Sequence, residues 1–323
     1  MPTEPIPNRE KIMVKPAFIE RYRQLLGKDY DKFMEYSFSY IRKAIRVNTL
    51  KSSVEEVKNR LEKKWHLVPV PWCKEGFWIT FKGDEEQEKR FDIGNLIEHA
   101  MGYIYVQDPA SMIPPVVLDP KPGELVLDMC AAPGSKTSQL AQYMENEGII
   151  IANDIAGDRL KPLGVNLQRC GVANTVITLS QGRYFLKAGL VFDRVLVDAP
   201  CSGTGTIRRS FKTLQMWSSN LIRRLVHDQR ILIDTGYQVL KNGGILVYST
   251  CTHEPEENEG IVSWLLEKYP DARLEEMQLD INRSTPMTAY NNTVYSEEVR
   301  RCLRIYPFDN DTEGFFVARI RKG

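Results

Sequence analysis

ELVLDMCAAPGSKTSQLAQYMEN (124–146) and GIIIAND (148–154) are the two stretches that decide the fold of this 323-residue chain. In the first, a short apolar run leads through small residues into a segment with helical character. The second is another apolar run. Apolar runs and helix-like segments keep alternating from about residue 120 onward, which is typical of a parallel β-sheet covered by helices on both faces. We therefore predict an α/β fold with a mostly parallel sheet.

Later segments with the same patterns extend this sheet. Strands are predicted at 175–180, 192–200 and 244–251, and helices at 158–171, 216–243 and 255–270. The helix over 216–243 is expected to end at Gly243, because glycine commonly terminates helices. Near the end of the chain, LRIYP (303–307) and GFFVARIRK (314–322) predict a closing antiparallel strand pair.

The first hundred residues follow a different pattern. At roughly 150 residues per domain the length suggests two domains, which we place at 1–100 and 101–323. The N-terminal domain should be a small α+β unit. Its expected elements are helices at 16–26 and 31–45, a strand at 44–50 and a helix capped by Ser52 or Ser53.

Composition excludes several classes of protein. With 42% apolar and 26% charged residues the chain is neither fibrous nor largely disordered. No apolar run reaches the roughly 18 residues of a membrane-spanning helix, and the polar N-terminus lacks the apolar core of a secretory signal. Six cysteines are too few for a disulfide scaffold, and none forms a C-x-x-C pair, so we expect no metal site. These features predict a cytoplasmic protein with reduced thiols, which we expect to be a monomer.

The charges are unevenly distributed although the net charge is only +1. Residues 1–50 carry 10 Lys and Arg against 6 Asp and Glu, and residues 201–230 carry 6 against 1. Such segments can offer a basic face to a polyanion, or they can simply be solvated helix faces. The sequence leaves both interpretations open.

The turn after the first strand of the sheet predicts a ligand site. Its small residues lead into a helix N-terminus, which suits a negatively charged ligand, and Asp154 ends the next strand, where an acidic side chain commonly holds ribose hydroxyls. The turn is not a P-loop, because Ser135 and Cys130 stand where that motif needs glycine, and it is not G-x-G-x-x-G. This favours an adenosyl cofactor other than a nicotinamide. The alternative is that Asp154 only caps the following helix.

Two cysteines follow the next two strands. DAPCSGTG puts Asp198 and Cys201 after one strand, and YSTCTHEPEEN puts Cys251 at the end of its neighbour. Adjacent strands lie about 4.8 Å apart, so both thiols should open into one cleft. A thiolate that adds to C6 of a pyrimidine makes C5 nucleophilic toward a methyl donor, and a carboxyl group can supply a proton at N3. The alternatives are two buried small apolar side chains or a disulfide.

These stretches resemble the RNA (cytosine-5)-methyltransferases of the Nop/Sun family, which use S-adenosyl-L-methionine. The resemblance implies a Rossmann-like methyltransferase sheet, with Cys251 as the nucleophile and Cys201 assisting product release. Asp198 would contact the base or the cofactor. The family usually has Asp where this chain has Gln181, whose amide could still accept from the adenine amine. The matching stretches are RVNTLK (46–51), YVQDPASM (105–112), DMCAAPGSKT (128–137), VDAPCSGTG (197–205), YSTCTHEPEENE (248–259) and DTEGFFVARIRK (311–322). The cofactor contacts implied are Ala131, Ala132, Pro133, Gly134, Ser135, Lys136, Asp154, Arg159, Gln181 and Asp198.

The resemblance also implies an RNA partner. We favour tRNA because a small basic N-terminal domain suits a small folded RNA, and rRNA is the alternative. A DNA-type enzyme would instead take its nucleophile from Cys201, and an inactive RNA-binding protein with a methyltransferase fold would need neither cysteine. Candidate RNA contacts, which could equally be ordinary core and surface residues, are Tyr36, Tyr40, Arg42, Lys43, Arg46, Arg208 and Arg209.

Overall fold

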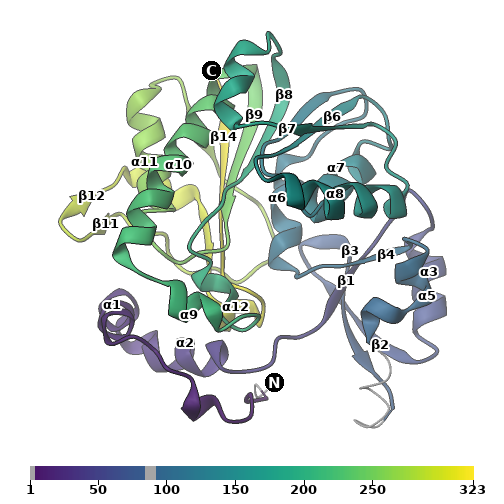
Figure 1. Cartoon of the computed structure of the whole chain (residues 1–323), viewed down its shortest axis with the longest axis horizontal. Helices are drawn as coiled ribbons and strands as arrows, with labels where there is room; N and C mark the ends of the chain where they lie inside the picture. Colours follow the sequence, from purple (N-terminus) through teal and green to yellow (C-terminus); the bar gives the residue numbers. More distant parts are fainter. Residues whose placement is uncertain (1–3, 84–91) are drawn as a thin grey trace.

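The computed structural model describes residues 4–83 and 92–323 (Figure 1). Within them, the larger sheet has the strand order β10-β14-β9-β8-β5-β6-β7, and β13 pairs with β14. This confirms the α/β fold with a mostly parallel sheet. The strands are β5 (Leu125–Asp128), β6 (Ile149–Asp154), β7 (Thr175–Leu179), β8 (Phe192–Asp198), β9 (Leu240–Thr250), β10 (Arg273–Glu275), β13 (Leu303–Ile305) and β14 (Phe315–Arg321).

The direction of the strands creates one functional edge. The strands β5 to β9 are parallel to their neighbours, while β14 runs antiparallel to β9 and closes the sheet with β13, as predicted. The chain goes from β5 outward to β6 and β7, then returns to β8 on the other side of β5. The carboxyl ends of β5 and β8 therefore flank the point where ligands bind in such sheets.

Helices cover both faces of this sheet, and the alternation of strand residues explains why. In β5, Val126 and Leu127 are both fully buried but face opposite sides, because successive side chains of a strand alternate. Val126 belongs to the core under α6 and α7, and Leu127 to the core under α10 and α11. Figure 1 shows α10 and α11 in front of the left half of the sheet. The helices are α6 (Ile113–Leu118), α7 (Ser135–Tyr143), α8 (Gly157–Cys170), α10 (Ser219–Gln238) and α11 (Glu259–Lys268).

The N-terminal region splits into two parts. One is an antiparallel sheet with the order β2-β3-β1-β4. The helix α3 lies between β1 and β2 in the chain, and Ser53 caps it through a capping box. The other is the helix pair α1 and α2, whose Phe18 and Phe33 pack with Trp217 from the α/β part. Figure 1 shows this pair away from the small sheet. The elements are α1 (Pro16–Leu26), α2 (Tyr30–Ser37), β1 (Ala44–Val47), α3 (Val54–Leu61), β2 (Trp65–Val70), β3 (Cys73–Phe81), α5 (Ile97–Ala100) and β4 (Ile104–Val106).

The single helix predicted over 216–243 is wrong. The chain forms a short α9 (Lys212–Met216), then α10, whose first turn is capped by the Ser218 hydroxyl. The strand β9 already begins at Leu240, and Gly243 lies inside it with a φ of 75°. Between the pairs Phe192–Leu240 and Arg194–Ile245 the register shifts, so this glycine serves a bulge rather than a helix end. In the described segments, no helix combines the length and apolar character needed to cross a bilayer.

Candidate active site

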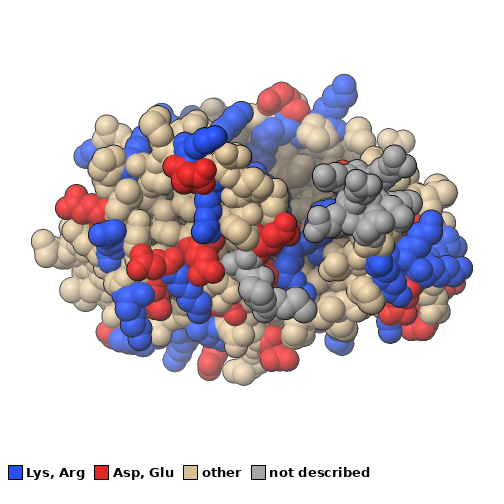
Figure 2. Space-filling view, turned by 90° about the horizontal axis from the view of Figure 1, so that it is seen from below, with Lys and Arg blue, Asp and Glu red and all other residues tan. Residues whose placement is uncertain are grey.

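A cleft of about 570 Å³ lies where the carboxyl ends of β5 to β9 meet α10. It is the place predicted for the adenosyl cofactor and the two thiols. Figure 2 looks at the molecule from this lower side and shows Lys and Arg mixed with Asp and Glu rather than one continuous basic surface. The cleft is lined by Met129, Cys130, Ala132, Asn153, Asp154, Ile155, Arg159, Ser180, Gln181, Gly182, Arg183, Asp198, Ala199, Pro200, Cys201, His227, Asp228, Ile231, Leu232 and Cys251.

The two predicted thiols meet in this cleft. The Sγ atoms of Cys201 and Cys251 are 3.4 Å apart, close enough to share a hydrogen bond, and both cysteines are free. Their loops meet because β8 and β9 are paired in parallel, with Asp198 opposite Ser249. The hydrogen bond with Cys251, together with burial, raises the pKa of Cys201 well above its ordinary value. The Cys201 thiol therefore stays protonated and can donate a hydrogen bond to the Cys251 sulfur.

A close backbone contact holds the two cysteine loops together. The Gly205 N–H donates to the Cys251 carbonyl at 2.9 Å, and the Gly314 N–H donates to the Gly205 carbonyl at 3.0 Å. A Cβ atom on Gly205 would lie 2.2 Å from the Gly314 oxygen and 2.8 Å from the Cys251 oxygen. Only glycine allows the backbones to approach this closely.

Glu257 joins the Cys201 loop to α10. Its carboxylate accepts from the Ser202 N–H at 3.0 Å, from the Ser202 hydroxyl, and from the Gln229 amide at 2.8 Å. Burial raises the pKa of Glu257 to about 7. Nothing in the sequence distinguishes this glutamate, although it lies inside the YSTCTHEPEENE motif. Its role becomes visible only when Ser202 and Gln229 come together in the fold.

Asp198 is held in place by two polar side chains. One oxygen accepts from the Ser249 hydroxyl at 2.7 Å, and the other lies 2.7 Å from the Lys136 ammonium. Burial lowers the pKa of Lys136, but the charge and hydrogen bond of Asp198 outweigh burial and leave this pKa raised. Lys136 therefore carries a positive charge next to Asp198, close to the two cysteines.

Asp154 accepts hydrogen bonds from the cofactor turn and from the chain just before α8. Its carboxylate accepts from the Ala132 N–H at 3.3 Å and from the Ala156 N–H at 3.1 Å, just before α8 begins. Arg159 lies 3.2 Å from the same carboxylate. Asp154 thus borders the cleft and also braces the start of a helix, and Gln181 stands exposed on the same wall.

The predicted cofactor loop lies only partly on the cleft wall. Ala132 lines the cleft, whereas Ala131, Pro133, Gly134 and Ser135 are not among its lining residues. These four residues shape the turn instead. The Gly134 N–H donates to the Ala131 carbonyl at 2.8 Å, and Gly134 has a φ of 101° where α7 begins.

One wall of the cleft was missed by the sequence analysis. His227, Asp228, Ile231 and Leu232 come from α10. Their spacing is that of one helix face, but the same spacing is expected of any amphipathic helix. Only the packing of α10 against the sheet identifies which face borders the cleft.

Two of the candidate RNA contacts are buried. Arg46 is fully buried and donates to the Gln107 side chain at 2.5 Å, the Ser135 carbonyl at 2.8 Å and the Ser138 hydroxyl at 2.8 Å. Arg208 is 6% exposed and pairs with Asp311 at 2.8 Å. The interpretation of these two arginines as RNA contacts is wrong, because both side chains are buried and their guanidinium groups bind interior partners.

The comparisons with known proteins agree with this geometry. The sequence matches a family model described as 16S rRNA methyltransferase RsmB/F over residues 115–321. A tRNA (cytosine(49)-C(5))-methyltransferase of Pyrococcus abyssi is 48% identical over 312 residues, which cover 96% of each chain. The chain belongs to the RsmB/F family of RNA (cytosine-5)-methyltransferases. Its activity is accordingly the S-adenosyl-L-methionine-dependent methylation of C5 of cytosine in RNA.

Other RsmB/F relatives extend the match to the N-terminal region and to solved structures. The N-terminal domain of 16S rRNA methyltransferase RsmF matches residues 14–109. A ribosomal RNA small subunit methyltransferase F of Erwinia tasmaniensis is 40% identical over 323 residues, and the chain spans 64% of its length. A methyltransferase homologue from Pyrococcus horikoshii superimposes with a TM-score of 0.86 at 40% identity, covering 97% of each chain. The NSun6 structure from the same species, determined with SFG, gives 0.82 at 26% identity, with 95% of this chain and 98% of that one covered.

The cleft fits the cofactor that the family uses. Asp154, at the end of β6, lines the cleft at the place where the sequence predicts a carboxylate for ribose hydroxyls. Gln181 presents an amide oxygen that can accept from the adenine amine. Ile155, Ile231 and Leu232 add apolar surface for the base. These donors, acceptors and apolar side chains suit an adenosyl group.

Proposed function

We propose that this enzyme methylates C5 of a cytosine in tRNA, with Cys251 as the nucleophile. The observation that carries the chemistry is the pair of thiols 3.4 Å apart beside the cofactor cleft. The tRNA substrate is supported by the Pyrococcus abyssi relative, which the chain matches over 96% of that protein's length. The rRNA-methylating relative from Erwinia tasmaniensis is considerably longer than this chain, which makes rRNA the second candidate.

Catalysis begins when the target base leaves its stack and enters the cleft. The Cys251 sulfur adds to C6, so that C5 becomes nucleophilic. Asp198 hydrogen-bonds N3 and passes it a proton, for which the adjacent Lys136 ammonium is the source. S-adenosyl-L-methionine, when bound, supplies the electrophilic methyl group. Asp154 and Gln181 would hold the cofactor.

Release of the product depends on the second thiol. Water in the cleft takes the C5 proton, the electron pair of that C–H bond forms the C5–C6 double bond again, and the bond from C6 to the Cys251 sulfur breaks. The N3 proton returns through Asp198 to Lys136. The departing sulfur takes up the electron pair of that bond. Cys201, which holds its proton tightly, donates a hydrogen bond to this sulfur and stabilises the charge.

The two cysteine variants test these roles. Cys251→Ala should abolish methylation and form no covalent complex with RNA. Cys201→Ala should permit attack but stall release, leaving protein joined to RNA on a denaturing gel. Asp198→Ala should slow adduct formation itself. If the adduct accumulates in Cys251→Ala and is absent in Cys201→Ala, the roles of the two cysteines are reversed.

The substrate is tested in parallel. Labelled S-adenosyl-L-methionine is supplied with an unmodified tRNA transcript or with transcribed 16S rRNA, and bisulfite sequencing locates the product. Methylation of the rRNA alone would overturn the tRNA proposal. That the enzyme works in the cytoplasm and as a monomer stays a prediction, which fractionation and sedimentation would check.

A further inference from the structure

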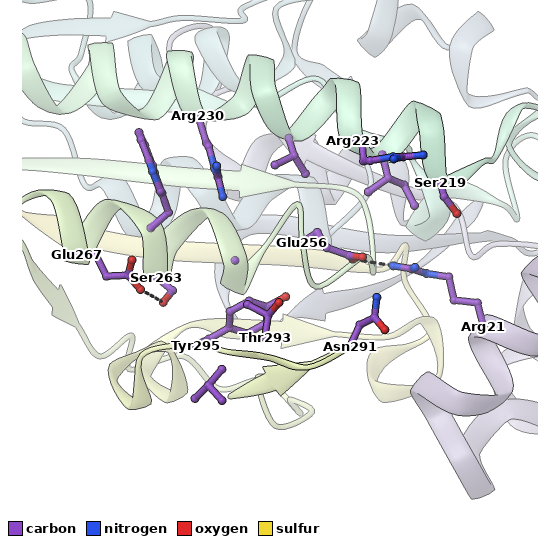
Figure 3. Close-up of a pocket in the computed structure, with 15 residues that line it drawn as sticks. Arg21, Ser219, Arg223, Arg230, Glu256, Ser263, Glu267, Asn291, Thr293 and Tyr295 are labelled. Atoms are coloured by element: carbon purple, nitrogen blue, oxygen red, sulfur yellow. Dashed lines mark hydrogen bonds and ion pairs between the residues drawn. The ribbon is translucent and has the colours of Figure 1, made fainter.

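A second hollow of about 570 Å³ lies on the other side of α10 (Figure 3). It is bounded by α10, α11, Arg21 of α1, and the hairpin formed by β11 (Ala289–Tyr290) and β12 (Thr293–Val294). We name it the α10–α11 pocket. Its lining residues are Arg21, Ser219, Ile222, Arg223, Val226, Arg230, Glu256, Gly260, Ser263, Trp264, Glu267, Asn291, Thr293, Val294 and Tyr295.

Only the width of α10 separates this pocket from the cofactor cleft. Val226 and Arg230 face the pocket, while His227 and Ile231 face the cleft. A helix with its side chains is roughly 10–12 Å across. At roughly 3.4 Å per stacked nucleotide, about three or four nucleotides of one RNA strand cover that distance. An RNA whose target base enters the cleft therefore passes within reach of the pocket.

The pocket offers two guanidinium groups to an anion. Arg223 and Arg230 are exposed, and among residues 4–83 and 92–323 neither has a carboxylate within 4.0 Å. Arg230 lies over the Trp264 ring at 5.4 Å, and Arg223 donates to the Asn220 side chain. Figure 3 shows Arg230 reaching from α10 toward α11.

The third arginine of the pocket is already neutralised. Arg21 lies 2.6 Å from both Glu254 and Glu256, and Figure 3 shows its side chain directed at Glu256 rather than into the open pocket. Its ion pairs with Glu254 and Glu256 hold α1 against the loop before α11. Binding of an anion therefore depends on Arg223 and Arg230.

The remaining lining groups indicate what kind of anion fits. Glu256 and Glu267 also border the pocket, and their carboxylates oppose a polyphosphate but can accept from ribose hydroxyls or base amino groups. Trp264 is partly exposed and presents an aromatic ring of the kind on which nucleobases stack, while the buried Tyr295 forms part of the floor. We propose that the α10–α11 pocket binds one nucleotide of the substrate RNA outside the target cytosine. The phosphate lies on Arg223 and Arg230, and the base packs on the aromatic side.

The decisive experiment compares two double variants with the same loss of charge. Arg223→Ala/Arg230→Ala removes the pocket cations. Lys121→Ala/Lys241→Ala removes two exposed lysines near the amino ends of β5 and β9, at the opposite edge of the sheet. Binding of transcribed tRNA and of transcribed 16S rRNA is measured over a series of salt concentrations, and the KM for RNA is measured on whichever RNA is methylated. Thermal melting confirms that each variant is folded.

The pocket variant should bind RNA about tenfold more weakly, with a raised KM and an unchanged kcat. Its salt slope should fall by about 0.7, which corresponds to one phosphate contact on a single strand. The lysine variant should bind as the wild type does. Equal losses in both variants, or no loss in either, would overturn the proposal.

A third variant and a free nucleotide identify the source of the ligand. Trp264→Leu keeps an apolar side chain but removes the ring, and it should weaken RNA binding by at least about fivefold. AMP is titrated alone as the probe for a free nucleotide. If AMP saturates the pocket while none of the pocket variants changes the affinity for RNA, the ligand is a free nucleotide and the proposal is wrong. Because both RNAs are assayed, methylation of rRNA alone refutes the tRNA substrate without affecting this test.

Discussion

Gly205→Ala should disturb catalysis without touching any reacting group. The added Cβ would stand 2.2 Å from the Gly314 oxygen and 2.8 Å from the Cys251 oxygen, both of them backbone atoms that cannot rotate away. The two backbone hydrogen bonds of Gly205 would lengthen, at roughly 0.5–1.5 kcal/mol each. Overpacking adds roughly 1–3 kcal/mol. We expect a loss of about 2–6 kcal/mol in the free energy of unfolding.

Activity should suffer as well, because the same shift separates the loops of Cys201 and Cys251. A displacement of about 1 Å at reacting groups can cost about a hundredfold in rate. Urea unfolding measures the stability, and methyl transfer from labelled S-adenosyl-L-methionine into RNA measures kcat.

A matched glycine serves as the control for this variant. A Cβ on Gly157, at the start of α8 beside the cleft, would meet only the Leu179 side chain at 3.7 Å, an ordinary contact. Gly157→Ala should therefore keep its activity and change the stability by less than about 1 kcal/mol. The reasoning fails if Gly205→Ala unfolds at the wild-type urea concentration with an unchanged kcat, or if both variants lose activity equally.

Three further predictions concern the cofactor, the basic segment and pH. S-adenosyl-L-methionine at 100 times its Kd should stabilise the wild type by about 2.7 kcal/mol. A melting shift of the same size in Asp154→Ala would show that Asp154 does not contribute to cofactor binding. Arg208→Ala should lower the free energy of unfolding in urea by at least about 2 kcal/mol, because it removes a buried guanidinium that pairs with Asp311 and donates to the Ser39 and Thr312 carbonyls. Arg209→Ala removes an exposed cation and should weaken RNA binding; its loss of stability should be smaller, because burial raises the pKa of its partner Glu313 to about 8 and this carboxyl can stay protonated. Burial raises the pKa of Glu257 to about 7, so the stability that its protonated form contributes is complete below about pH 4.5 and is lost as the pH rises through 7. Unfolding in urea at pH 6 and at pH 9 should show part of this loss. An equal loss in the Glu257→Gln variant would contradict the prediction.

The sequence predicted the parts of the site that depend on strand order. Cys201 and Cys251 each follow a strand, and neighbouring parallel strands bring their carboxyl ends together, so their meeting required no knowledge of side-chain packing. The place of Asp154 at the cleft follows for the same reason, and its contact with the cofactor stays a prediction. Its contacts with the Ala132 and Ala156 N–H groups depend on the loops and could not be predicted.

What the sequence could not predict depends on long-range packing. Arg46 and Arg209 are both arginines in basic segments, yet one is fully buried and the other is exposed. Their difference arises from which polar groups the fold brings near each side chain. The helix end predicted at Gly243 was wrong for a related reason, because a glycine with positive φ can end a helix and can also form a bulge in a strand.

Buried Arg46 has a consequence for the evolution of this architecture. Its strand belongs to the small N-terminal sheet, but its guanidinium holds Ser135 and Ser138 at the start of α7, beside the cofactor turn. The small sheet is therefore a structural support of the cofactor site as well as a neighbour of it. Exchange of this sheet for another module would leave the α7 start unsupported unless the new module supplied an equivalent cation. Substrate range in such a chain can change by additions at its ends or by altered surface residues far more readily than by replacement of the small sheet.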